Sequence, residues 1–119
     1  MQPQRILGNN GESLVCEWLN QHHFTILARN YQTRRGEVDI IATKDEVVAF
    51  IEVKTRNKEY FPIAQVVTYG KQQRIIMAAH HFILANQLRD KVFRFDIATV
   101  IFEDGKPQIE YIPNAFTER

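Results

Sequence analysis

The chain has 119 residues, of which 45% are hydrophobic and 24% charged, the composition of a folded globular protein rather than of a disordered one. Fifteen Lys and Arg stand against fourteen Asp and Glu. The resulting net charge of +1 excludes bulk charge as the basis of nucleic-acid binding, so any such function must rest on a local patch. We expect one domain, spanning residues 1–119.

The cysteine content and the apolar runs limit the cellular compartments in which the protein is expected. A single cysteine, Cys16, excludes an internal disulfide and any zinc site built from several cysteines, and it favours a reducing compartment. Residues 1–14 lack the apolar stretch of a signal peptide, and apolar runs such as 47–51 are far too short to cross a bilayer. We therefore predict a cytoplasmic protein that does not associate with membranes.

The first predicted element is an amphipathic helix over residues 11–23, because its apolar residues recur with a helical period. Its buried stripe comprises Leu14, Val15, Trp18 and Leu19. Glu12 falls at the edge of that stripe and therefore borders the core. Residues 24–31 then indicate a strand, and the polar stretch 32–36 indicates a break.

The clearest pair of strands covers residues 37–43 and 47–55, which a short polar turn joins into a predicted β-hairpin. A second helix is expected from an N-cap at Thr68 to about residue 86, and two last strands between residues 92 and 112. The inward residues of that helix are predicted to be Ile75, Ile76, Ala79, Phe82 and Ile83. The expected class is α/β, with elements in the order αβββαββ.

Charged residues stand out on the second hairpin strand. Strand side chains alternate faces, so Glu52 and Lys54 share a face with Val48 and Phe50. Both faces of this strand begin apolar, which is typical of a central strand covered on both sides. Glu52 and Lys54 are therefore charges at the end of an otherwise buried face, and such a placement usually has a functional reason.

The preceding strand brings a second carboxylate to this face. A turn closed between residues 42 and 47 pairs Asp39 with Phe50. The same register pairs Glu37 with Glu52, so Asp39 and Glu52 become diagonal neighbours roughly 7–8 Å apart. Oxygens at that separation can share a divalent cation. A register shift of two residues would keep the faces and change the pairing.

Two converging carboxylates repel each other unless a cation or a lysine neutralises them. Lys54 is placed to orient or deprotonate an attacking water and to stabilise charge that develops on a phosphate. Hard oxygen ligands and a phosphate substrate favour Mg²⁺ or Mn²⁺ over zinc. The alternative is that Asp39, Glu52 and Lys54 form a structural ion pair near a strand end.

Basic residues cluster in sequence around the proposed site. They are Arg34, Arg35, Arg56, Lys58, Lys71 and Arg74. Lys71 falls in the first turn of the second helix, whose N-terminus favours phosphate. The cluster predicts a basic rim that binds nucleic acid, although each member is also explained as a solvated surface charge. Glu37 either tunes the metal site or binds a second ion, or it forms a cross-strand pair with Lys54 or Arg56.

Several segments, taken in order, carry a family resemblance. They are Gly11-Glu12, LARNY at 27–31, GEVDIIA at 36–42, FIEVKTR at 50–56, Lys71 at a helix start, and RFDIATV at 94–100. Over roughly residues 8–102 the chain resembles the YraN-type family of endonuclease-like proteins, within the PD-(D/E)XK restriction-endonuclease-like superfamily. Val38 stands where the nominal superfamily motif has proline.

The resemblance implies a restriction-endonuclease-like core, a mixed central β-sheet flanked by helices. It implies that Asp39 and Glu52 are metal ligands and that Lys54 is the catalytic lysine. The Holliday-junction-resolvase branch carries a glutamate on its first helix, and here Glu12 would complete the metal site. The alternative is that Glu12 is a solvated residue or interacts with the helix N-terminus.

The implied activity is metal-dependent hydrolysis of phosphodiester bonds in DNA, with structured or branched DNA favoured. Small nucleases of this fold often pair to cut two strands, which leaves a homodimer open. The alternative function is a non-catalytic module that keeps the fold and binds nucleic acid or a protein partner, since a fold does not establish an activity.

Overall fold

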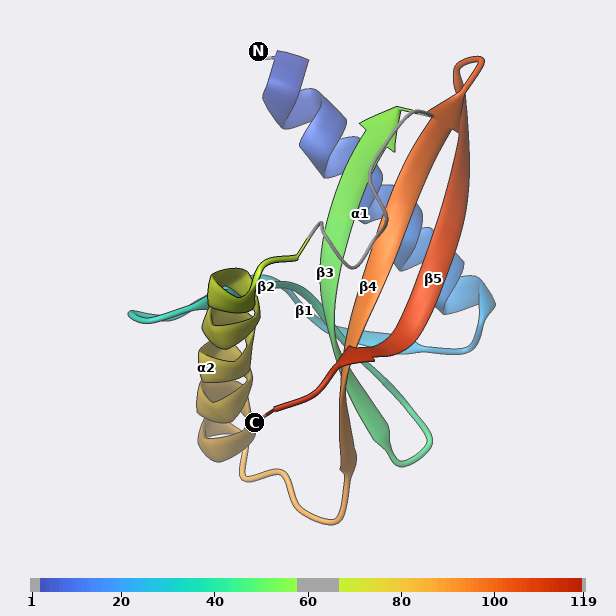
Figure 1. Cartoon of the computed structure of the whole chain (residues 1–119). Coiled ribbons are helices and arrows are strands. Elements are labelled where there is room, and N and C mark those ends of the chain that lie inside the picture. Colours follow the sequence, from blue (N-terminus) through green and yellow to red (C-terminus); the bar gives the residue numbers. More distant parts are fainter. Residues whose placement is uncertain (1–2, 58–66, 119) are drawn as a thin grey trace.

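The computed structural model describes residues 3–57 and 67–118 (Figure 1). Its elements are α1 (Pro3–Gln21), β1 (Thr25–Gln32), β2 (Glu37–Lys44), β3 (Val47–Asn57), α2 (Tyr69–Ala85), β4 (Val92–Glu103) and β5 (Lys106–Phe116). The strands form one five-stranded sheet in sequential order, in which β3 and β4 are parallel and the other neighbours antiparallel. The predicted α/β class with a mixed sheet is confirmed and is compatible with a restriction-endonuclease-like core.

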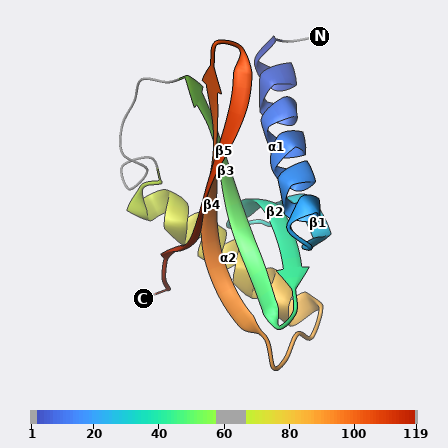
Figure 2. The same cartoon turned by 90° about the vertical axis from the view of Figure 1, so that its right-hand side faces the viewer.

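The two helices cover opposite faces of the sheet (Figures 1 and 2). On one face Ile75 and Phe82 of α2 pack against Phe50, and on the other Leu19 of α1 packs against Ile51. Strand β3 is therefore buried on both sides, as its apolar run predicted. Each large side chain buried in this way contributes about 1.5–3 kcal/mol. Neither helix in the described part of the chain has an apolar stretch of membrane-spanning length.

The first helix differs from its prediction at both ends. It begins at Pro3, a residue type well suited to a first helical turn. The prediction missed this part because Ile6 and Leu7 are too few to show a helical period before Gly11. The helix ends at Gln21 rather than at His23, which adopts a left-handed φ of 68°. The Phe24 N–H then donates to the Leu19 carbonyl at 2.9 Å, a bond that closes the helix C-terminus.

The predicted inward face of α2 is confirmed, and its helix limits agree closely with the prediction. Ile75, Ile76, Ala79 and Phe82 are buried, and Ile83 is half-buried. Thr68 caps the helix as expected, since its Oγ1 accepts a hydrogen bond from the Lys71 N–H at 3.2 Å. The last hairpin is longer than predicted, because the left-handed residues Asp104 and Gly105 form a tight turn between β4 and β5.

The predicted register of the β2–β3 hairpin is wrong by two residues. Lys44 pairs with Val47 and Ile41 with Phe50, so Asp39 does not lie opposite Phe50, nor Glu37 opposite Glu52. The turn is shorter than expected because Asp45 adopts a left-handed φ of 54°, which aspartate tolerates better than most residues. In addition, the Thr43 hydroxyl donates to the Val47 carbonyl at 2.8 Å.

The sheet splits between β2 and β3. Their pairing ends at Ile40 and Ile51, whereas β2 stays paired with β1 as far as Glu37 and β3 with β4 as far as Asn57. The two strands therefore diverge (Figure 1). We call this divergence the fork, and Asp39 and Glu52 are the first residues of β2 and β3 beyond the last pair.

Candidate functional site

Asp39 holds the fork together. Its Oδ2 accepts a hydrogen bond of 2.8 Å from the Val53 N–H of β3. This side chain takes the place of the backbone ladder that ended at the Ile40–Ile51 pair, and it satisfies an N–H that the divergence of the strands would otherwise leave without its ladder partner. The half-buried Asp39 carboxylate is thereby fixed between the two strands.

Glu52 is the buried charge of the site, with 3% of its surface exposed. Its Oε2 lies 3.5 Å from Lys54 Nζ and 3.3 Å from Lys71 Nζ, and Asp39 is the neighbouring carboxylate. Burial and the adjoining Asp39 carboxyl raise the pKa of Glu52 to about 7, against the lowering effect of the two lysines. At neutral pH the paired carboxylates therefore attract either a proton or a cation.

The two lysines reach Glu52 from different elements. Lys54 follows it on β3, whereas Lys71 comes from the first turn of α2, which the Thr68 cap places over the fork. Their side chains remain 30% and 34% exposed, so both ammonium groups can also face an incoming anion. The sequence placed Lys71 on a local basic rim; the structure places it in direct contact with the Glu52 carboxylate.

Glu12 approaches the fork from α1. Its Oε1 is buried without a hydrogen-bond partner, and Arg29 Nη2 lies 3.8 Å away. Burial and the charge of Asp39 raise the pKa of Glu12, whereas Arg29 and a hydrogen bond with Asn30 lower it. The preceding Gly11 explains the approach, because a Cβ there would overlap the Thr55 hydroxyl. Glu12 is thus electrostatically coupled to Asp39 and is not an independent surface charge.

These groups fit a hard divalent cation in part. Asp39 and Glu52 supply adjacent carboxylate oxygens, and Glu12 adds a buried oxygen that lacks a donor. Within residues 3–57 and 67–118, however, no three Asp, Glu, His or Cys side chains converge closely enough to hold an ion. The residues that could hold a metal are therefore Asp39 and Glu52 directly, with Glu12 set back beside Arg29.

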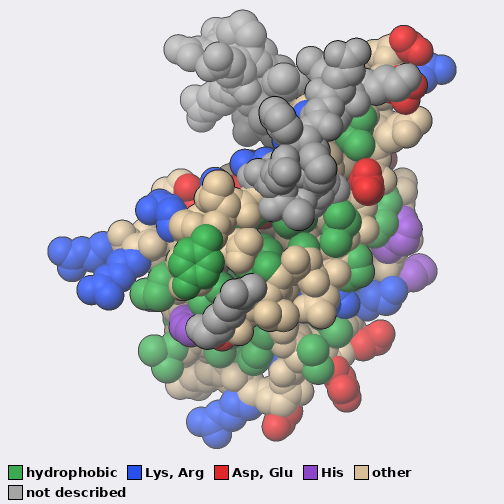
Figure 3. Space-filling model, in the orientation of Figure 1, with side chains coloured by type: hydrophobic (Ala, Val, Ile, Leu, Met, Phe, Trp, Pro, Cys, Tyr) green, Lys and Arg blue, Asp and Glu red, His purple; other side chains and the backbone are tan. Residues whose placement is uncertain are grey.

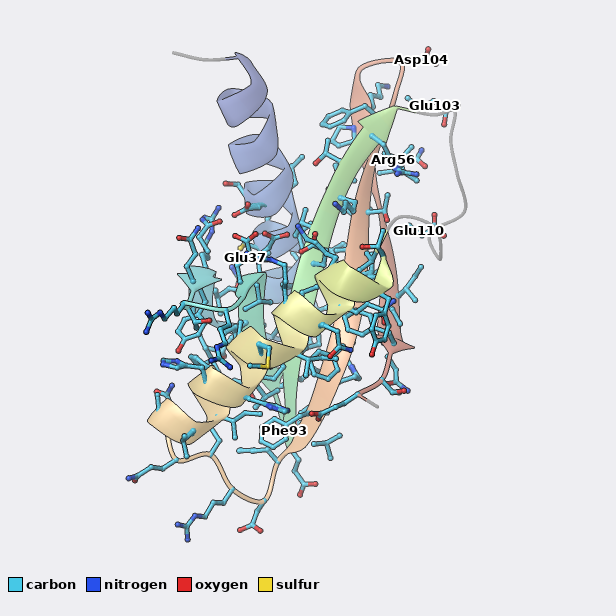
Figure 4. All side chains as sticks on the ribbon, turned by 60° about the vertical axis from the view of Figure 1, so that its left-hand side comes forward. Glu37, Arg56, Phe93, Glu103, Asp104 and Glu110 are labelled. Carbon is cyan, nitrogen blue, oxygen red and sulfur yellow. The ribbon has the colours of Figure 1, made fainter. Side chains whose placement is uncertain are left out.

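Glu37 has a different partner from those that the sequence suggested. Its Oε1 lies 3.9 Å from Nη2 of Arg74 on α2. Figure 4 shows Glu37 at the start of β2 and Arg56 near the far end of β3, where the strands have diverged. The predicted cross-strand pair with Lys54 or Arg56 is therefore replaced by a pair with Arg74, because β2 and β3 are no longer paired beyond Ile40 and Ile51.

Arg34 and Arg35 lie on the connection between β1 and β2, and both are exposed. Thr33 Oγ1 accepts hydrogen bonds from the N–H groups of Arg35 and Gly36, at 3.3 and 3.1 Å, which shape this turn. A Cβ at Gly36 would overlap the Arg74 carbonyl, so the turn rests directly on the α2 backbone. Figure 3 shows Lys and Arg side chains projecting where this connection projects in Figure 1.

The residues of the predicted basic rim thus lie in separate places on the structure. Lys71 and Arg74 lie at the fork, and Arg34 and Arg35 lie on the β1–β2 turn, which contacts α2. Arg56 is half-buried further along β3. The sixth predicted member, Lys58, lies outside the described residues.

Sequence reasoning missed a buried polar cluster around Asp96 on β4, which is fully buried. Arg94 donates to its carboxylate from Nε and Nη2 at 3.0–3.2 Å, the Tyr111 hydroxyl donates a further hydrogen bond, and the Asn114 N–H donates one at 2.8 Å. A charge between apolar residues of a strand was the available signal. The cluster anchors β5 to β4 on the opposite side of β3 from the fork.

Comparison with known proteins gives the family. The model of the family described as "Uncharacterised protein family UPF0102" matches residues 11–100, a range that includes Glu12, Asp39, Glu52, Lys54 and Lys71. A UPF0102 protein of Geobacter metallireducens is 42% identical over 111 residues, which cover 92% of this chain and 91% of the relative. A UPF0102 protein of Alkaliphilus metalliredigens is 40% identical over 111 residues, covering 92% and 96%.

A third relative, the UPF0102 protein of Anaeromyxobacter dehalogenans, is 38% identical over 115 residues, which cover 95% of this chain and 85% of the relative. The matches run over nearly the whole length of both partners, and the family match contains every segment on which the resemblance rests. The resemblance to a known family is thereby confirmed. The chain belongs to the family UPF0102.

Proposed function

We propose that this protein is a metal-dependent nuclease that hydrolyses phosphodiester bonds in DNA, with Mg²⁺ or Mn²⁺ held by Asp39 and Glu52. The observation that carries the proposal is the convergence at the fork of two neighbouring carboxylates and two lysines. A buried carboxylate whose pKa is raised to about 7 beside a second carboxylate is costly to ionise unless a cation shares the site.

The residues at the fork have distinct tasks in this proposal. A bound cation would supply Lewis acidity and would lower the pKa of water for attack on phosphorus. Lys54 and Lys71 hold two positive charges where the phosphate gains negative charge as water adds and one P–O ester bond breaks. The buried Glu12 Oε1 lacks a donor and can accept a hydrogen bond from water in the fork.

DNA is proposed as the substrate because cations flank the fork. Arg74 pairs with Glu37 beside the carboxylates, and Arg34 and Arg35 extend the cationic surface along α2. The family resemblance favours structured or branched DNA, for which a pair of copies could cut two strands.

One observation favours a second candidate function. The charge of Glu52 is already compensated by Lys54 and Lys71, and no third acidic ligand closes on the pair within the described residues. Such a site can bind DNA without turning it over. The second candidate is therefore a non-catalytic module that binds nucleic acid or a protein partner.

Cleavage of a panel of duplex, single-stranded and branched DNA in Mg²⁺ or Mn²⁺ tests the proposal. We expect Asp39→Asn and Lys54→Ala each to lower the cleavage rate by about 100-fold or more. The amide introduced by Asp39→Asn retains a carbonyl oxygen that can accept from Val53 N–H, so this variant removes the charge and keeps the fork. The matched control is Lys106→Ala at the exposed start of β5, which should cut like the wild type.

The two candidate functions give different results in the same assay. If both site variants lose cleavage but still bind DNA and keep the wild-type thermal stability, the result supports a nuclease. Wild-type protein that binds the panel but cuts none of it supports the binding module instead.

A further inference from the structure

A separate cavity of about 410 Å³ lies on the α1 side of the sheet, at the Val47 end of β3. It opens between the end of α1, the β2–β3 turn and the strands β4 and β5. Glu52 lies five residues further along β3 and faces the α2 side, roughly 16 Å away along the strand. The volume is within the range of pockets for small ligands. Nothing in the proposed cleavage reaction uses this cavity.

One wall of the cavity is a stack of rings. Trp18 stacks on His22 with ring centroids 3.7 Å apart and on Tyr111 with centroids 4.7 Å apart, at interplanar angles of 20° and 19°. Phe24 adds a tilted ring 6.5 Å from that of Tyr111. His22, Trp18 and Tyr111 thus form a stack of nearly parallel rings from α1 and β5, and a further planar ring, nucleobases included, can stack on the end of such a stack.

The polar lining is held in place from behind. The Asp96 carboxylate, fully buried beneath the cavity, binds Arg94 through Nε and Nη2 and accepts the Tyr111 hydroxyl. Both side chains also line the cavity. Their positions are therefore fixed before any ligand arrives, which lowers the entropic cost of binding.

The cavity also carries a positive charge that Asp96 does not neutralise. Lys44 lies over the Phe24 ring, with Nζ 5.6 Å from the ring centroid, rather than on a carboxylate. Among the described residues of the lining, the exposed Asp45 is the one acidic residue, against Lys44 and Arg94. A ligand that fits has a planar ring for the stack and an anionic group for Lys44.

We propose that this cavity binds a nucleotide, with its base against the Trp18–Tyr111 stack and its phosphate facing Lys44. A free mononucleotide and a nucleotide within a single strand present the same chemistry to the cavity. The proposal does not rest on the proposed nuclease activity, because it requires neither a metal nor the carboxylates of the fork.

Trp18 makes the test direct, because it is the only tryptophan of the chain and lines the cavity. The full-length protein, in chelator without divalent cations, is titrated with thymidine monophosphate and separately with a short oligothymidylate, and its tryptophan emission is recorded. We expect a saturable change in emission. Lys44→Gln should weaken the apparent affinity by about tenfold, since it removes a charged contact to phosphate.

The matched control is Lys106→Gln, which removes a lysine at the exposed start of β5, outside the cavity, and should bind like the wild type. Phe24→Leu, which keeps an apolar side chain, should weaken binding as well. A change with the mononucleotide identifies free nucleotide as a sufficient ligand, and a change with the oligonucleotide alone identifies a strand. Unchanged emission with both ligands, or equal affinities for wild type and Lys44→Gln, overturns the proposal.

Discussion

At the scale of single residues, the buried Glu52 gives the protein a pH-dependent stability. Its pKa is raised to about 7 in the folded state, whereas an exposed glutamate ionises near 4.5. Between these values the unfolded state loses its proton first, so the folded state becomes less stable as pH rises from about 4.5 to about 7, and the effect then levels off. The full effect is up to about 3 kcal/mol.

Glu52→Gln should remove this dependence. Without divalent cations, we expect the free energy of unfolding of the variant relative to wild type to rise by up to about 3 kcal/mol between pH 4.5 and 7.5. Urea unfolding at a series of pH values measures it. The exposed Glu17→Gln on α1 is the control and should follow the wild type. Parallel profiles for wild type and Glu52→Gln would show that the pKa of Glu52 is not raised in the folded state.

Some site residues could be predicted individually and their partners could not. Alternation along β3 was enough to put Glu52 and Lys54 on one face, because it depends only on local strand geometry. The contact of Lys71 with Glu52 depends on where α2 begins in space, which no local pattern specifies. Glu37 was given the wrong partner for the same reason, since Arg74 reaches it from another element.

At the scale of elements, periodicity located the strands and α2 well, but it could not determine pairing. Alternation is unchanged by a two-residue shift, so the pattern alone could not distinguish Asp39 opposite Phe50 from the observed pairing of Ile41 with Phe50. The left-handed conformation of Asp45 decides the register, and an aspartate in a polar turn is only weak evidence for it.

The contact between the β1–β2 turn and α2 should be very sensitive to a single substitution. Gly36→Ala places a Cβ against the Arg74 carbonyl, and backbone cannot move aside as a flexible side chain can. We expect a loss of about 2–4 kcal/mol in the free energy of unfolding, measured in urea, and weaker DNA binding because Arg34 and Arg35 shift.

Gly70→Ala provides the control for this substitution. It also adds one methyl group to a glycine, but nothing lies within 4 Å of the added Cβ. Stability should stay unchanged or rise by up to about 1 kcal/mol, because alanine favours a helix more than glycine does. Equal effects of the two substitutions would contradict the close contact at Gly36.

At the scale of the whole molecule, the fork gathers residues from both layers that cover the sheet. Glu12 arrives from α1 and Lys71 from α2, while Asp39 and Glu52 come from the strands between them. Such a site exists only in the folded protein, so a cation that binds it should stabilise the fold as a whole.

Mg²⁺ at ten times its dissociation constant should raise the free energy of unfolding by about 1.4 kcal/mol, because it binds the folded state alone. Thermal unfolding with and without Mg²⁺ measures the effect. Asp39→Asn should abolish it, whereas Glu17→Gln should retain it. Stabilisation that persists in Asp39→Asn would locate the ion elsewhere.

The hydrogen bond from Val53 to Asp39 also bears on which ion the protein would choose. It occupies one lone pair of Asp39 Oδ2, so Asp39 binds a cation more readily through Oδ1 alone than through both oxygens. Ca²⁺ often takes both oxygens of a carboxylate and tolerates seven or eight ligands, whereas Mg²⁺ accepts single oxygens in an octahedron. The hydrogen bond from Val53 would thus disfavour bidentate coordination by Asp39, and it would favour Mg²⁺ over Ca²⁺ at this site.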